Sequence, residues 1–171
     1  MIDNTVLKNE NIYRVFIYTQ EILDDKGNVL IESKPTGEYL EFDLEDIELP
    51  FKYQELADRL KKSKQNLRNQ FIIIEKKQDH KGKKLLSANE EAKFRALNEF
   101  FKEQARLYNL FLGENGVEKL LYGRKLGWST LSEIDKIIET TIAPKLDLTT
   151  KNITKKIKEK YSLYKEENVL E

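Results

Sequence analysis

SANEEAKFRALNEFFKEQARLYNLFLGENGVEKLLYGRKLGW, residues 87–128, carries the clearest folding signals in the chain. It opens with Ser87 followed three positions later by Glu90, the spacing at which both side chains cap the free amides of a starting helix. Behind this signal, apolar side chains recur at steps of three and four, which predicts a long helix with one broad apolar face. Gly113 is expected to end this helix, because glycine reaches left-handed backbone conformations at little cost. A second, short helical segment is predicted over 117–122.

The first part of the chain is typical of a small antiparallel sheet. β-Branched and aromatic side chains fill 12–22, and the Asp- and Gly-containing residues 24–28 predict a hairpin turn into a returning strand at 29–32. The sequence at 35–37 contains proline and glycine and interrupts the pattern, and alternating side chains over 39–44 then predict a third strand. Three short strands need helices on one face for stability.

A helix is predicted between the sheet and residue 87, over 50–77, with Pro50 in its first turn. Its apolar residues follow one stripe, but Phe71-Ile72-Ile73-Ile74 is a continuous apolar run rich in β-branched residues. Two interpretations therefore remain open at this stage. The helix continues through the run, or it ends near Asn69 and a strand follows.

Two further helices are predicted after residue 128. Thr130-Leu131-Ser132-Glu133 has the spacing of a second capping box, and Pro144 is expected to end the helix that begins there. A last helix is expected to start near Thr149 or Thr150.

These elements predict an α+β fold that is mainly α, with a small N-terminal antiparallel β-sheet followed by a bundle of four to five helices. We assign residues 1–48 to an acidic sheet region, 49–165 to a helical domain and 166–171 to a frayed tail. A chain of 171 residues suits one main core.

Charge is abundant but unevenly distributed. Charged residues make up 35% of the chain, against about 25% in an average domain, and the formal net charge is zero. Residues 1–50 carry 4 basic and 12 acidic side chains, whereas 51–85 carry 11 basic and 4 acidic ones. We expect these two segments to neutralise each other, either within one fold or between copies of the chain.

Several kinds of chemistry find no support in the sequence. The chain has no cysteine, which excludes disulfides and thiolate metal sites. Its single histidine, His80, lies in a charged loop without a partner for acid–base catalysis. Residues 113–116 lack the phosphate-loop pattern, and the acidic residues at 43–48 lack the spacing of an EF-hand. We therefore expect no catalytic residue, cofactor or metal ligand, and neither a signal peptide nor a membrane helix.

A basic run offers one electrostatic candidate. Lys61, Lys62, Lys64 and Arg68 lie on the predicted helix over 50–77 and could contact phosphates of a nucleic acid. A solvated helix face explains the same run more simply, and no zinc-finger, helix-turn-helix or RNA-binding signature accompanies it. A nucleic-acid-binding accessory protein is therefore the alternative function.

From about Phe100 onward, the chain resembles the tail assembly chaperones of long-tailed bacteriophages that infect Gram-positive bacteria. The resemblance rests on FF at 100–101 and on LFLGENGVEKLLYGRK at 110–125, followed by a helix and a lysine-rich end. It implies a helical, non-enzymatic protein of the host cell cytoplasm that binds the tape measure protein and assists assembly of the tail tube protein. It also implies a homo-oligomer.

Four residues are candidates for contacts with a protein partner under this resemblance: Phe111, Leu121, Tyr122 and Trp128. Each is also compatible with an ordinary place in the core. That simpler interpretation is favoured for the first three, whereas the two interpretations are balanced for Trp128, which follows Gly127 in a predicted turn.

Overall fold

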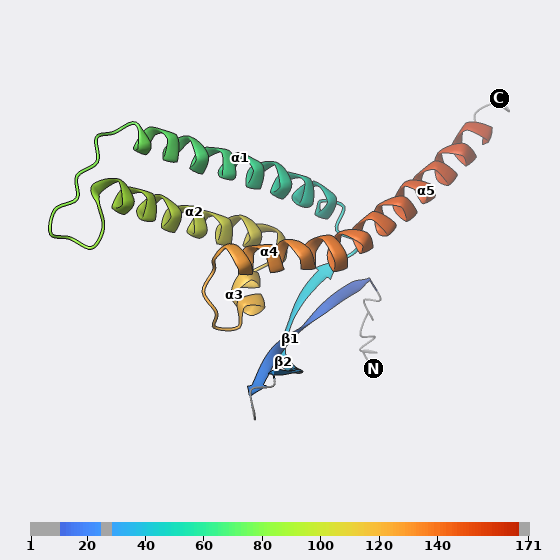
Figure 1. Ribbon diagram of the computed structural model, residues 1–171. Helices are drawn as coiled ribbons and strands as arrows, with labels where there is room; N and C mark the ends of the chain where they lie inside the picture. Colours follow the sequence, from blue (N-terminus) through green and yellow to red (C-terminus); the bar gives the residue numbers. More distant parts are fainter. Residues whose placement is uncertain (1–10, 25–28, 168–171) are drawn as a thin grey trace, which may run out of the picture.

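The computed structural model describes residues 11–24 and 29–167, and in it three arms extend from one hub (Figure 1). The arms are a β-hairpin, an antiparallel pair of long helices, and a single C-terminal helix. In chain order the elements are β1 (Ile12–Asp24), β2 (Val29–Asp43), α1 (Leu49–Glu75), α2 (Ala88–Leu112), α3 (Gly116–Leu121), α4 (Trp128–Ile137), the π-helical turn η1 (Ile138–Ile142) and α5 (Ala143–Glu167). The predicted fold class, mainly α with a small N-terminal antiparallel sheet, is confirmed.

The hydrophobic core lies where the three arms meet. Phe111 of α2 is at its centre, with its ring centroid 5.7 Å from that of Phe42 in β2 and 5.6 Å from that of Tyr53 in α1. The side chains of Leu40, Val117, Ile134 and Ile142 are almost completely buried there, so that β2, α3, α4 and η1 all contribute to the same core. The core is therefore centred on the hub and continues between α1 and α2, where Leu67, Ile74 and Phe100 are buried.

The predicted start and end of α2 are both confirmed. The amide of Glu90 donates to the Ser87 hydroxyl over 3.2 Å, and the amide of Ser87 donates to the Glu90 carboxylate over 2.7 Å. Gly113 ends the helix with a φ of 94°. Gly116 lets α3 fold back on α2, because a Cβ atom at this position would lie 2.5 Å from the Cβ of Leu112.

The predicted third strand is wrong, because the residues expected to form two strands form one long strand, β2. Tyr18 of β1 pairs with Pro35, and Phe16 pairs with Tyr39, so β2 accommodates the residues between them as a bulge. Gly37 supplies the positive φ of 83° that the bulge needs. The strand tolerates proline because a two-stranded sheet has an open edge on each strand. The predicted turn at 25–28 lies outside the described residues.

The β-branched run at the end of α1 is helical. The helix continues to Glu75, so the strand considered after Asn69 does not form. Leu67 and Ile74 are buried and Phe71 is half-buried, and their spacing places all three on the stripe that faces α2. Packing of this stripe decides the conformation against the weaker preference of β-branched side chains.

The helix after Gly127 begins three residues earlier than predicted, because its N-cap is Gly127 and not Thr130. It starts at Trp128, and the Thr130 hydroxyl accepts a hydrogen bond from the Gly127 amide over 2.7 Å. Thr130 therefore supports the helix start from inside the first turn instead of preceding it. Glu133 forms an ion pair with Arg124 over 2.7 Å and takes no part in capping.

Pro144 does not end this helix, so that prediction is also wrong. The turn η1 precedes it, with the Ala143 amide donating to the Ile138 carbonyl, five residues back. This wider turn accommodates a proline that has no amide to donate, and α5 continues beyond it. Thr149 and Thr150, near which the last helix was expected to start, lie inside α5, where their hydroxyls donate to carbonyls four residues back over 2.9 and 2.8 Å.

Candidate protein-binding surface

Trp128, the only tryptophan, sits on the surface of α2 and remains accessible to a partner. Its ring centroid lies 5.4 Å from that of Phe100 and 5.2 Å from that of Phe101, which are themselves 5.5 Å apart. Phe100 is buried, yet 57% of Trp128 is exposed. The indole is thus held in place from below by two phenylalanine rings while its other side faces solvent.

An apolar strip continues from Trp128 along α2. Phe94, Leu97 and Phe101 share one helix face by their spacing of three and four residues. Phe94 is 59% exposed, and the other two are half-buried. We call these four residues, Phe94, Leu97, Phe101 and Trp128, the Trp128 shelf. It is an exposed aromatic surface on the part of the helix pair that α4 leaves uncovered.

Two polar contacts hold α4 against the helix pair and thereby fix Trp128. The Tyr108 hydroxyl of α2 donates a hydrogen bond to the Asp135 carboxylate of α4. Burial, followed by this hydrogen bond, raises the pKa of Tyr108 far above its ordinary value. Lys64 of α1 approaches the same carboxylate at 4.0 Å. Tyr108 is completely buried, so α4 cannot leave α2 without breaking a charge-assisted bond.

The basic residues predicted from the sequence divide between two faces of α1. Lys61, Lys64 and Arg68 follow a spacing of three and four and therefore share one face, whereas Lys62 lies on another. All four are exposed. Because Lys64 reaches Asp135, the shared face turns toward α4, the side that carries the Trp128 shelf. The structure thus places three of these cations on the face of α1 that turns toward α4, and Lys64 is the one that contacts it.

The structure separates the four predicted contact residues into two pairs. Phe111 and Leu121 belong to the core, with 4% and 7% of their surface exposed, so neither is available to a partner in this conformation. Tyr122 and Trp128 are more than half exposed. Tyr122 ends α3 in the left-handed region, with a φ of 46°, which turns its side chain outward.

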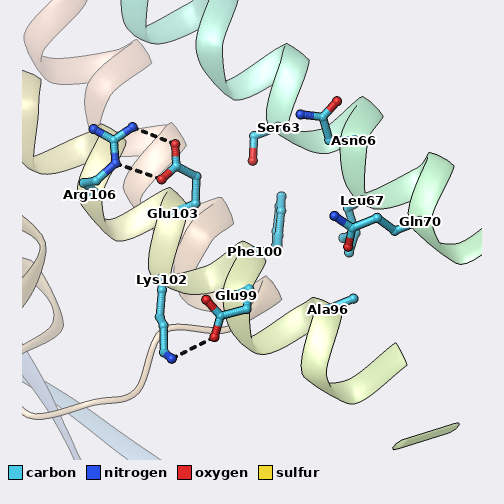
Figure 2. A pocket seen from close by; sticks show the side chains of 10 residues that line it. All are labelled: Ser63, Asn66, Leu67, Gln70, Ala96, Glu99, Phe100, Lys102, Glu103 and Arg106. Carbon is cyan, nitrogen blue, oxygen red and sulfur yellow. Dashed lines mark hydrogen bonds and ion pairs between the residues drawn. The ribbon is translucent and has the colours of Figure 1, made fainter. Parts of the chain in front are cut away.

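A groove that no sequence pattern predicted lies between α1 and α2 (Figure 2). It has a volume of about 400 Å³, with Leu67 and Phe100 at its floor and amide and hydroxyl side chains of α1 along one wall. The other wall belongs to α2 and carries two ion pairs, Glu99–Lys102 and Glu103–Arg106. Arg106 keeps the pKa of Glu103 below its usual range. These carboxylates are engaged by cations of their own helix.

Gln104 lies behind this groove and is completely buried. Its Nε2 donates to the Ser63 hydroxyl over 2.9 Å, while its Oε1 has no partner among the described residues. The only sign in the sequence is the residue itself, a polar side chain flanked by apolar positions of the α2 stripe. A buried, half-satisfied amide costs stability.

Other functional classes receive no positive evidence from the described residues. Within 11–24 and 29–167, no group of three or more candidate side chains is arranged to hold a metal ion. None of the helices in the same ranges is long and apolar enough to cross a bilayer. His80 lies in the exposed loop between α1 and α2, as expected.

Comparisons with known proteins give no further indication. No family model matches the chain, and neither a curated protein nor a solved structure is detectably similar to it. The function must therefore be argued from the surface itself.

Proposed function

We propose that this protein is a tail assembly chaperone of a long-tailed bacteriophage, which binds an amphipathic helical segment of the tape measure protein on the Trp128 shelf. The observation that carries the proposal is the exposed indole of Trp128, supported by Phe100 and Phe101 at the end of an exposed apolar strip. Soluble proteins rarely leave such aromatic surface open unless it binds another molecule. The sequence resemblance supplies the identity of the client.

The dimensions of the shelf suit a helix. Phe94 and Phe101 are seven residues apart on α2, which corresponds to about 10 Å along the helix axis, and Trp128 extends the surface further. This length matches two to three turns of a bound helix with apolar residues at every third or fourth position. Lys64 and Arg68 at the edge would attract acidic residues that flank such a stripe.

The role requires binding and no bond making or breaking. A tape measure protein is long and helical, and its apolar stripes need cover until the tail tube protein encloses them. The chaperone would act in the cytoplasm of the infected cell, in several copies along the client, and would help to recruit tail tube subunits. Nucleic-acid binding is the alternative, and the three aligned cations of α1 are the observation that favours it.

Trp128 provides a direct test, because it is the only tryptophan of the chain. The purified protein is titrated with a tryptophan-free helical fragment of a tape measure protein while the indole fluorescence is recorded. We expect saturable binding with a shift of the emission to shorter wavelength, because the fragment removes water from the indole ring. A 20-bp DNA duplex is titrated in parallel at low and high salt.

Two exposed phenylalanines make a matched pair of variants. Phe94→Asp removes the exposed ring at the end of the shelf that lies opposite Trp128 and should weaken binding at least about tenfold, since burying half of a phenylalanine side chain is worth about 1–1.5 kcal/mol. Phe51→Asp changes an even more exposed phenylalanine that lies outside the shelf, and it should bind like the unmodified protein. Equal loss in both variants, or unchanged emission with any fragment, would refute the proposal. Salt-sensitive binding of the duplex alone would favour the alternative.

A further inference from the structure

The outer face of the β-hairpin carries an exposed aromatic patch. Phe16 and Tyr18 are 60% and 58% exposed, and Tyr39 is 38% exposed. The rings of Phe16 and Tyr39 lie 6.0 Å apart, and the Arg14 guanidinium is 5.0 Å from the centre of the Tyr39 ring. Glu41 holds Arg14 in this position through a 2.8 Å ion pair. We call Phe16, Tyr18 and Tyr39 the hairpin patch.

The α5 arm carries an apolar stripe that begins in the core and continues into solvent. Leu146 is buried in the hub, Ile153 is half-buried, and Ile157 is 50% exposed. Helical spacing places all three on one face, with Lys156 and Lys160 along its border. An amphipathic stripe with a basic border is thus open along the outer part of α5.

The two arms have opposite charge. The described part of the hairpin, 11–24 and 29–43, contains six acidic and two basic side chains. From Ala143 to Lys160, α5 contains six basic and two acidic ones. The face of α1 that turns toward α4, in contrast, carries Lys64 and Arg68, which disfavours a basic helix on the Trp128 shelf. Charge therefore selects the hairpin patch as the binding surface for the α5 stripe.

Within one chain, these two surfaces diverge. Figure 1 shows α5 leaving the hub away from the hairpin. Near its root, Tyr13 of β1 donates to the Thr141 carbonyl of η1 over 3.4 Å, and the Lys145 ammonium of α5 lies 5.5 Å from the centre of the Tyr13 ring. This contact pairs a lysine of α5 with an aromatic ring of β1. The outer parts of α5 and of the hairpin carry the same two kinds of side chain and are free to form the same interaction between two molecules.

We propose that the α5 stripe of one copy of this chain docks on the hairpin patch of a second copy. Ile153 and Ile157 are one turn apart, about 6 Å along the helix, and Phe16 and Tyr18 are about 7 Å apart along the strand, so the two repeats match. The bordering lysines then face Glu38 and Glu41. Because each copy offers one of each surface, the contact is head-to-tail and joins copies into a ring or an open chain. The proposal does not depend on the identity of any client.

The absence of cysteine makes a cross-linking test clean. Two full-length single-cysteine variants, Tyr18→Cys and Ile157→Cys, are mixed in equal amounts and oxidised. We expect the disulfide between the two variants to form several-fold faster than the disulfide between Tyr18→Cys and the control Leu85→Cys, whose residue is 90% exposed in the α1–α2 loop. Preferential self-linking of either variant would indicate a symmetric contact of like arms and would overturn the proposal, as would a mixed disulfide no faster than the control.

A charge exchange provides an independent test by sedimentation. Lys156→Glu with Lys160→Glu reverses the charges that border the α5 stripe, and Glu38→Lys with Glu41→Lys reverses the charges beside the hairpin patch. Each double variant alone should sediment as a monomer under conditions in which the unmodified protein associates, and their mixture should associate again. Unmodified protein that stays monomeric at high micromolar concentration, or double variants that associate as it does, would refute the contact. Binding of a tape measure fragment to a monomeric variant would leave the proposed function intact.

Discussion

Replacing the buried glutamine of α2 by methionine should stabilise the protein. Gln104 is completely buried, and its Oε1 has no hydrogen-bond partner among the described residues. Such an unsatisfied polar atom costs about 1–3 kcal/mol, whereas the bond from Nε2 to Ser63 contributes about 0.5–1.5 kcal/mol. Methionine has a similar length and no polar amide, and Ser63 is half-buried beside the groove, where water can satisfy its hydroxyl.

The balance of these terms predicts that Gln104→Met raises the free energy of unfolding by about 1 kcal/mol. For a chain of this size, that corresponds to a rise in melting temperature of about 2–4 °C. Urea unfolding monitored by circular dichroism measures the free energy, and differential scanning calorimetry measures the temperature. The groove stays open in this variant, because Gln104 does not line it.

Ser63→Ala is the matched control, because it removes the other partner of the same bond. It leaves Nε2 without an acceptor in addition to Oε1, so the free energy of unfolding should fall by about 1–2 kcal/mol. Once Gln104 is methionine, Ser63→Ala should have almost no effect, and this non-additivity identifies the bond. Destabilisation by Gln104→Met of more than about 1 kcal/mol would show that Oε1 has a partner, and the reasoning would be wrong.

Two further predictions concern the core and an exposed ion pair. Phe111→Ala should lower the free energy of unfolding by about 3–5 kcal/mol, whereas Phe94→Ala on the surface should change it by less than about 0.5 kcal/mol. Urea unfolding of both variants measures these changes. Equal changes would contradict the burial of Phe111 and the exposure of Phe94. A hydrogen bond from Lys52 and then the Glu48 amide lower the pKa of Asp46 below its ordinary value of 3.8. Asp46 therefore contributes stability that is present above its unfolded pKa and is lost as the pH falls through its folded pKa. Urea unfolding between about pH 6 and pH 2 should show a shallower loss for Asp46→Asn than for the unmodified protein, and parallel curves would contradict this assignment.

The elements predicted correctly are those whose signals are local. The capping box of α2 needs only Ser87 and Glu90 three residues apart, and both bonds form within the first turn. The end of α2 at Gly113 depends on one residue's backbone freedom. The hairpin pairing follows likewise from neighbouring strands with alternating side chains.

The wrong predictions concern prolines and a threonine, whose effect on the backbone depends on the residues packed or paired around them. Pro35 interrupts the strand pattern, but a bulge beside it keeps β2 continuous because the other strand, β1, supplies a partner on both sides. Pro144 lacks an amide, but η1 absorbs the missing bond while Ile138 and Ile142 are buried in the hub. In each case, packing or pairing beyond the local sequence overrode a local preference.

The candidate surface, too, was only partly predictable from local sequence signals. Periodicity identifies the apolar residues of α2, but it cannot show which of them a neighbouring element covers. Phe111 is covered by β2 and α1, whereas Phe94 lies beyond the reach of α4 and stays exposed. The groove and the orphaned amide of Gln104 arise from the distance between two helices that are separated by a loop.

The amino-acid sequence by itself determined where α1 begins, where α2 begins and ends, and which faces of both helices are apolar, because proline at a first turn, capping, spacing and glycine geometry act within a few residues. Only the tertiary structure decided that the core is centred on a hub, that Trp128 is packed on phenylalanine rings from one side, and that the acidic hairpin and the basic α5 point apart. Those properties depend on which surfaces meet across long sequence separations, and burial is a property of the meeting surfaces and not of either segment alone.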